Sequence, residues 1–173
     1  MYKRQVLFLV GAWGYSPLEA GLSMTPGAII AAAVALRAGP VVARSGPWAV
    51  IAGGALVLGT PGLLCAVALP QEPAFLTFWL PLAVPIGIGT GAITTGVSTA
   101  AALAVAPERF AAAVGLNQTG RQVGGALGIA VLAALLAHPG PGTGPYADVY
   151  AFCTLATFAV AATALWLITK EHS

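Results

Sequence analysis

The most constraining feature of this sequence is a series of apolar blocks, each close to twenty residues long. A helix of about twenty apolar residues spans the hydrocarbon core of a bilayer. Only 7% of the residues are charged and 58% are hydrophobic, whereas soluble domains carry about 25% charged residues. The sequence therefore predicts an all-α membrane protein formed as one module over residues 1–173. Five spans are expected, at about 18–36, 48–69, 75–97, 120–137 and 149–168.

The N-terminal segment 1–13 is apolar from Val6 onwards but is too short to cross a membrane alone. We interpret it as a partial helix, the end of a helix whose beginning is missing. A signal peptide is the alternative, although no small-residue cleavage site closes the apolar run. Ser16 followed by Pro17 predicts the start of the next helix, with Ser16 as its N-cap.

The basic residues predict how the chain is oriented. They fall in the segments 37–47 and 106–121 and at the C-terminus, whereas the breaks between them carry carboxylates and no Lys or Arg. Cytoplasmic loops of membrane proteins carry an excess of Lys and Arg. We therefore expect an integral protein of the cell (inner) membrane with its C-terminus in the cytoplasm. Lys3 and Arg4, in the partial segment, are the exception to this alternation.

The stretch 116–130 is polar at its start and apolar beyond, which is typical of a helix that enters a bilayer. Small residues recur every four positions here and in the preceding span, at Gly87, Gly91, Gly120, Gly124 and Gly128. Residues four apart share one helix face, and small residues on a face let another helix approach closely. We predict helix packing at both glycine faces. A sliding contact for alternating access is the alternative.

The polar side chains at the start of this stretch are candidates for a substrate pathway: Asn117, Gln118, Arg121 and Gln122. Arg121 has two interpretations. It faces a central cavity, with Asn117 one turn before it, or it anchors the cytoplasmic end of the helix by pairing with head-group phosphates or with Glu108. Charge near helix ends is common, which favours the anchor. Gln118 and Gln122 either line the cavity or form interhelical hydrogen bonds.

The sequence contains no pattern that predicts an enzyme, a metal site or a cofactor. Cys65 and Cys153 each lie inside an apolar block, and His138 and His172 are not at ligand spacing from them. No zinc-binding His-Glu motif, Ser-His-Asp set, acidic pair or Gly-rich phosphate loop is evident. The basic residues are scattered, so no nucleic-acid partner is expected. The lipid bilayer is the partner that the composition predicts.

Three motifs occur in order along the chain: the run Gly-Tyr-Ser-Pro-Leu-Glu-Ala-Gly-Leu at 14–22, the loop residues Gly39, Arg44 and Gly46, and the segment 106–128. Together they resemble the fourteen-helix drug:proton antiporter branch of the major facilitator superfamily (EmrB/QacA type). The resemblance covers nearly the whole chain. It implies the C-terminal bundle of such a transporter, from the end of the ninth helix to the fourteenth. In the full-length family it implies export of hydrophobic, often cationic compounds in exchange for protons.

The chain departs from the family pattern in two places. Ala43 stands where the family loop usually has Asp before the residue matching Arg44, which weakens the charge-paired latch that the resemblance implies for this loop. No predicted span has an Asp or Glu near its middle, although a proton relay needs an ionisable group inside the membrane. The resemblance places the proton-coupling acids mostly in an N-terminal half, so that missing bundle is an expected partner.

The sequence therefore predicts the C-terminal portion of a multidrug-efflux transporter that does not transport by itself. A non-transporting membrane interaction protein, which packs through its glycine-rich helix faces, is the alternative. A membrane-embedded enzyme is a third hypothesis, and the absence of any catalytic motif counts against it.

Overall fold

The computed structural model describes residues 9–11, 14–68, 70, 72–137 and 144–171. Over these residues the chain folds as four long helices without a β-strand: α2 (Pro17–Val67), α3 (Leu80–Leu103), α4 (Phe110–Leu136) and α5 (Gly144–Glu171). The π-helix η1 (Phe75–Trp79) precedes α3, and the 3-10 helix η2 (Pro107–Arg109) precedes α4. The predicted all-α class is confirmed.

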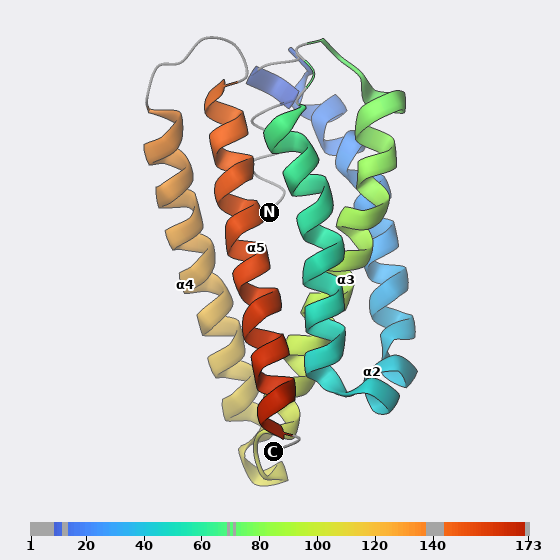
Figure 1. Cartoon of the computed structure of the whole chain (residues 1–173), viewed down its shortest axis with the longest axis vertical. Helices are drawn as coiled ribbons and strands as arrows, with labels where there is room; N and C mark the ends of the chain where they lie inside the picture. Colours follow the sequence, from blue (N-terminus) through green and yellow to red (C-terminus); the bar gives the residue numbers. More distant parts are fainter. Residues whose placement is uncertain (1–8, 12–13, 69, 71, 138–143, 172–173) are drawn as a thin grey trace.

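Each of the four long helical regions is apolar and long enough to cross a membrane. α2 has 51 residues and would be about 75 Å long if straight, which is more than twice the hydrocarbon thickness of about 30 Å. It consists of two helices joined at Gly46, where φ is 76° and ψ is 160°. Its two parts, 17–45 and 47–67, run in opposite directions in the blue-to-teal ribbon of Figure 1. The described residues thus provide five helical segments of spanning length.

The segment 37–47, predicted as a loop, is helical at all residues except Gly46. Gly46 adopts a positive φ without steric cost because it has no side chain. It also precedes Pro47, and the ring of a proline disfavours the helical conformation of the residue before it. One residue therefore suffices to reverse the chain. Arg37 and Arg44 mark where the helix leaves the apolar region, but they do not interrupt it.

Each of the five predicted spans overlaps a helical segment. Three lie wholly within helical segments: 18–36, 75–97 and 149–168. The other two run past a helix end, 48–69 past Val67 and 120–137 past Leu136. Most of the predicted partial helix 1–13 lies outside the described residues, but residues 9–11 are helical.

The start of α2 is fixed by a reciprocal capping box. The Ser16 hydroxyl accepts a hydrogen bond from the backbone N–H of Glu19 at 3.3 Å, and the Glu19 carboxylate accepts one from the backbone N–H of Ser16 at 2.9 Å. Beside it, Leu9 and Ala20 are fully buried against Trp79. The end of the N-terminal segment, the start of α2 and the start of α3 therefore meet at one end of the bundle.

Glycines let α3 fit between the two parts of α2. On one side, a Cβ atom at Gly91 would lie 2.5 Å from the carbonyl oxygen of Ala31, and Gly87 makes an equally close approach to the same part of α2. On the other side, a Cβ atom at Gly89 would lie 2.6 Å from the carbonyl oxygen of Gly54. Such separations are shorter than any side chain permits, so backbone packs directly on backbone here.

The second part of α2 also packs against α5 through glycines. A Cβ atom at Gly59 would lie 2.6 Å from the ring of Phe158, and one at Gly62 would lie 2.5 Å from the Thr154 hydroxyl. The Thr154 hydroxyl itself donates to the carbonyl oxygen of Tyr150 at 2.8 Å. The compact part of the bundle therefore consists of the first part of α2, α3, the second part of α2 and α5, packed in that order.

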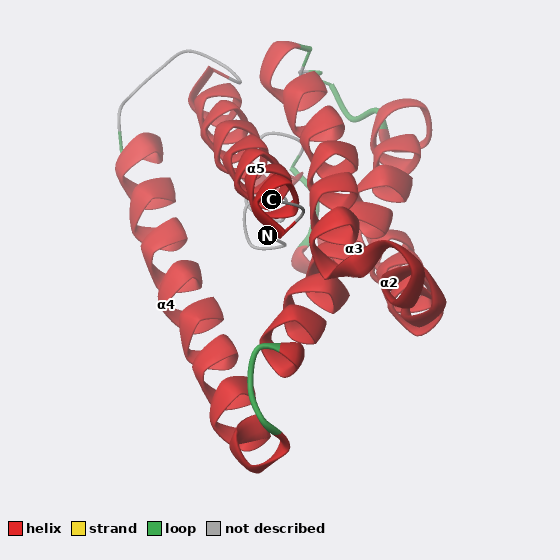
Figure 2. Ribbon diagram, turned by 60° about the horizontal axis from the view of Figure 1, so that its bottom comes forward, coloured by secondary structure: helices red, strands yellow, loops and turns green. Residues whose placement is uncertain are grey.

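α4 stands apart from this compact part, as Figure 2 shows. Leu132 is its only buried residue. The prediction that this helix packs on its neighbours through Gly120, Gly124 and Gly128 is not met within the described chain, because no described atom lies within 4 Å of a Cβ built at any of them. A face of small residues allows another helix to pack closely, but no described helix packs against this face of α4.

Candidate functional site

Charged side chains divide between the two ends of the bundle, which we name the basic end and the acidic end. The Gly46 turn, η2 and the end of α5 lie together at the lower end of Figure 1. The starts of α2 and α5 and the connection between α2 and α3 lie at the upper end. By their positions in these elements, the basic end carries Arg44, Arg109 and Lys170 together with Glu108, and the acidic end carries Glu19, Glu72 and Asp148.

Contacts between neighbouring helices give the level of each residue along the bundle. The first part of α2 runs parallel to α3, with Ala31 against Gly91, so Arg37 is level with Val97 near the basic end. Glu19 and Arg37 are 18 residues apart on one helix, which is about 27 Å. The apolar band between these charges therefore matches the hydrocarbon thickness of about 30 Å.

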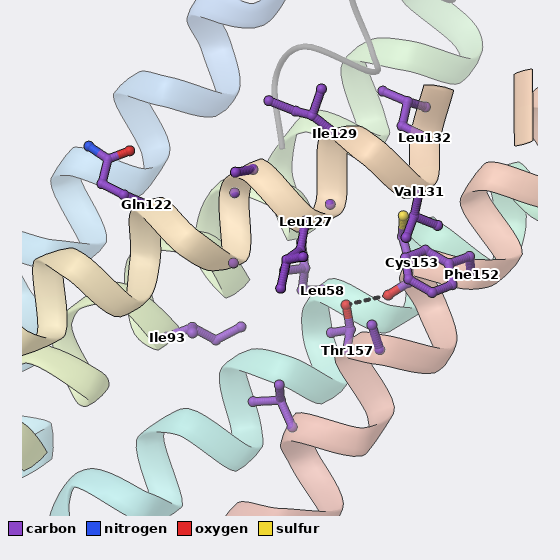
Figure 3. Close-up of a pocket in the computed structure, with 16 residues that line it drawn as sticks. Leu58, Ile93, Gln122, Leu127, Ile129, Val131, Leu132, Phe152, Cys153 and Thr157 are labelled. Atoms are coloured by element: carbon purple, nitrogen blue, oxygen red, sulfur yellow. Dashed lines mark hydrogen bonds between the residues drawn. The ribbon is translucent and has the colours of Figure 1, made fainter. Parts of the chain in front are cut away.

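Arg121 lies near the basic edge of this apolar band. Val131 of α4 and Cys153 of α5 line the same cavity (Figure 3), and the two helices run in opposite directions. Arg121 is therefore close to the level of Thr163 and Ala164. Ala164 packs with Ile51 in the cluster that Val97 contacts, so Arg121 is near the level of Arg37, and Lys170 lies about 10 Å further along α5. Lys170 itself is at the end of its helix, with its ammonium 5.2 Å from the centre of the Trp166 ring.

The face of α4 that carries Arg121 is covered by the bundle at Leu132 but is exposed from Gly128 to Arg121. Arg121 shares this face with Asn117, Gly124, Gly128 and Leu132, because these residues follow the three- and four-residue spacing of a helix stripe. Leu132 is buried and Asn117 is half-buried, whereas Arg121 and the glycines are exposed. Within the described part of the chain, Arg121 makes no ion pair and no hydrogen bond.

A cavity of about 950 Å³ lies between α4 and α5 and reaches Leu58 of α2 and Ile93 of α3 (Figure 3). Its described lining contains no Asp, Glu, Lys or Arg. The polar lining side chains are Gln122, Cys153 and Thr157, and the Thr157 hydroxyl donates to the carbonyl oxygen of Cys153 at 2.7 Å. The cavity is therefore an apolar space with one side-chain amide at its edge.

The structure separates the predicted pathway residues into two adjoining groups. Gln122, Gly124 and Gly128 line the cavity. Asn117 and Arg121 lie on the same helix below it, and Gln118 is exposed beside them. The sequence did not identify the α5 wall, formed by residues such as Phe152, Cys153 and Thr157. Ordinary residues in an apolar helix carry no signal that they face a cavity.

The predicted loop motif lies at and before the turn of α2. Gly46 supplies the positive φ of the turn, Arg44 is exposed two residues before it, and Gly39 is helical with open space around it. Ala43 is also exposed. The motif therefore holds the turn at the basic end, and Gly46 is the residue that the backbone geometry requires there.

Metal chemistry finds no support in the described residues, since no cluster of three or more His, Cys, Asp or Glu side chains occurs among them. Both cysteines are free thiols, with Cys65 buried and Cys153 partly buried. No metal or cofactor was expected from the sequence.

The long apolar helices, the charges confined to the bundle ends and the glycine-mediated helix contacts define a polytopic α-helical membrane protein. The chain belongs to the Major Facilitator Superfamily, whose family model matches residues 5–173. It is thus an integral protein of the cell membrane. No solved structure gives a significant match.

Three curated relatives are similar to most of the chain. Cephamycin export protein CmcT of Amycolatopsis lactamdurans is 36% identical over 69% of this chain and 24% of its own length. Puromycin resistance protein pur8 of Streptomyces alboniger is 35% identical over 72% of the chain and 25% of its length. The tetracenomycin C resistance and export protein of Streptomyces glaucescens is 32% identical over 75% of the chain and 24% of its own length. The chain thus spans about a quarter of the length of these relatives.

Proposed function

We propose that this chain forms the C-terminal bundle of a membrane exporter of small hydrophobic compounds. The observation that carries the proposal is the family match over residues 5–173, together with relatives of which two are named as export proteins. The substrate pathway runs along the α4 face that carries Asn117 and Arg121 and reaches the cavity at Gln122. The large apolar cavity beside this face supports that assignment.

Transport by this bundle requires a second bundle. Alternating access works by rocking one bundle against another around a shared site, and the open face of α4 leaves room for such a partner. An N-terminal bundle is the partner we propose. The described spans hold no carboxylate between the basic and acidic ends, so proton coupling, if the exporter follows its family resemblance, resides in that N-terminal bundle.

The basic end faces the cytoplasm in this proposal. Arg37, Arg44, Arg109 and Lys170 gather there, and such an excess of Lys and Arg is retained on the cytoplasmic side. The C-terminus is then cytoplasmic, and the acidic end faces outwards.

Drug export in a bacterial strain that lacks its own efflux pumps tests the function. The chain expressed alone is expected to export no puromycin or hydrophobic dye. A pur8 hybrid, in which the chain replaces the segment of that relative that it matches, is expected to restore export. Export by the chain alone would contradict the requirement for two bundles, and a well-expressed, inactive hybrid would count against the transport assignment.

The open glycine face of α4 favours a second function, that of a non-transporting membrane interaction protein. In that case the chain binds a partner helix bundle through Gly124 without moving a substrate. Pull-downs from detergent extracts with the parent chain and with the Gly124→Leu variant distinguish the interaction protein from the exporter. A partner that is captured by the parent chain, is lost with the leucine and has no effect on drug export supports the interaction protein.

A further inference from the structure

We infer that Thr94 and Ser98 of α3 form a hydrogen-bonding wall of the substrate pathway and bind the polar groups of the substrate. The inference rests on the proposed exporter and assigns recognition to residues outside the α4 face described above. It follows from how the hydroxyl groups inside the membrane are hydrogen-bonded.

The first argument is a contrast between the helices. A Ser or Thr hydroxyl on a membrane helix can donate to the carbonyl oxygen one turn earlier, which spares it the cost of an unpaired polar group in hydrocarbon. Seven hydroxyls of α2, α4 and α5 do so: those of Ser23, Thr25, Thr60, Thr119, Thr154, Thr157 and Thr163. Five hydroxyls in the second half of α3 make no hydrogen bond within the described residues: those of Thr90, Thr94, Thr95, Ser98 and Thr99. Their bonding capacity is therefore left for another molecule.

The second argument is the face on which these hydroxyls lie. Thr90, Thr94 and Ser98 are spaced four residues apart and share one face of α3. Thr94 and Ser98 are exposed, whereas the Thr90 hydroxyl oxygen is enclosed and has no hydrogen-bond partner in the described part of the chain. Because Val97 is level with Arg37, this face runs from the basic edge of the apolar band about 10 Å inwards to Thr90. A polar strip thus enters the membrane from the basic end.

The third argument is that this face adjoins the cavity. Ile93, the residue before Thr94, lines the cavity together with Gln122 of α4 (Figure 3). The Thr157 hydroxyl in the lining is already bonded within α5. A hydroxyl both donates and accepts hydrogen bonds, so Thr94 and Ser98 add the polar contacts that the mostly apolar cavity lacks. A substrate whose apolar body lies in the cavity therefore meets these hydroxyls with its polar groups.

Thiol labelling in the pur8 hybrid tests whether this face lines a water-filled pathway. Methanethiosulfonate reagents react with the thiolate, which forms in contact with water and not in hydrocarbon. Thr94→Cys is therefore expected to react at least about tenfold faster than Gly53→Cys, and saturating puromycin is expected to abolish this difference. Gly53 is the matched control, since it is exposed on α2 and its neighbour Gly54 lies against Ile93 at the same level. Equal rates for the two cysteines, or labelling that puromycin leaves unchanged, would overturn the inference.

Isosteric variants of the same hybrid measure the hydrogen bonds. Thr94→Val and Ser98→Ala are each expected to raise the puromycin concentration for half-maximal export about 2–10-fold, the contribution of one hydrogen bond. Thr94→Ser keeps the hydroxyl and is expected to match the parent hybrid. Thr60→Val is the control, because Thr60 is exposed on α2 and its hydroxyl is already bonded to the carbonyl oxygen of Leu56 at 3.2 Å. A Thr94→Val variant with a lower maximal rate and an unchanged half-maximal concentration would identify a contact with the N-terminal bundle and overturn the inference.

The outcome is separable from that of the proposed function, because labelling and its protection by puromycin do not require export. If the hybrid exports puromycin but Thr94→Cys is neither reactive nor protected, only the inference fails. If Thr94→Cys is reactive and protected in a hybrid that does not export, the hydroxyl wall stands and the exporter proposal fails.

Discussion

Replacing Gly89 with alanine tests the packing that holds the bundle together. A Cβ atom at this position would lie 2.6 Å from the carbonyl oxygen of Gly54, 2.6 Å from the Cβ atom of Leu58 and 2.9 Å from the Leu58 backbone nitrogen. Two of these three atoms belong to the backbone of α2, so no side-chain rotation relieves the clash. The helices must move apart, and the contacts along the seam between α3 and α2 weaken.

The size of the effect follows from a matched comparison with Gly128→Ala. Both glycines lie within helices, so the gain in helix propensity of about 1 kcal/mol is shared by the two variants and cancels in their difference. Gly128 has no described atom within 4 Å of its Cβ position, so it reports that gain alone. Overpacking costs about 1–3 kcal/mol, which is the expected difference in the free energy of unfolding between the variants.

Thermal unfolding in detergent micelles measures this difference. A dye that becomes fluorescent on reaction with thiols reports exposure of Cys65, which is 2% exposed in the folded chain. At roughly 2–4 °C per kcal/mol for a chain of this size, Gly89→Ala is expected to melt about 2–12 °C below Gly128→Ala. Equal melting temperatures would refute the close approach of α3 to α2.

Three further substitutions test local features. Ser16→Ala removes the capping box of α2 and is expected to lower stability by about 0.5–2 kcal/mol in the same melting assay; no change would contradict the cap. Gly46→Ala forces a side chain to a φ of 76° and a ψ of 160°, a region essentially restricted to glycine, and should destabilise by about 1–3 kcal/mol, whereas Gly53→Ala, which has open space, should not. Trp166→Ala removes the ring beneath the Lys170 ammonium and should cost about 0.5–1 kcal/mol; an effect that high salt leaves unaltered would argue against the cation–π contact.

Much of the helical framework was accessible from the sequence because membrane helices are set by apolar length. The spans and the Ser16 helix start depend on local properties, namely hydrophobicity and a capping hydroxyl. The loop over 37–47 was misjudged for a physical reason. Arg37 and Arg44 were treated as loop residues, although basic side chains also sit on a helix that extends past the hydrocarbon core.

The tertiary contacts were less accessible. Gly87 and Gly91 carry the same four-residue spacing as the glycines of α4, yet only the former lie against another described helix. The four-residue spacing shows which helix face allows another helix to pack closely. Which helix packs there depends on the tertiary fold. The position of Arg121 along the bundle was open for the same reason, since it depends on the register of α4 against α5. The α5 wall of the cavity, including Thr157, gave no sequence signal at all.

The number and direction of the membrane crossings are the central claim, because the cytoplasmic location of the basic end depends on them. The most direct measurement is labelling of introduced cysteines in intact cells with a membrane-impermeant maleimide. Glu72→Cys, at the acidic end, is expected to react from outside, and Ser45→Cys, at the α2 turn, only after the membrane is permeabilised. The parent chain, with its buried and partly buried thiols, serves as the control. Labelling of both positions from the same side would contradict the account.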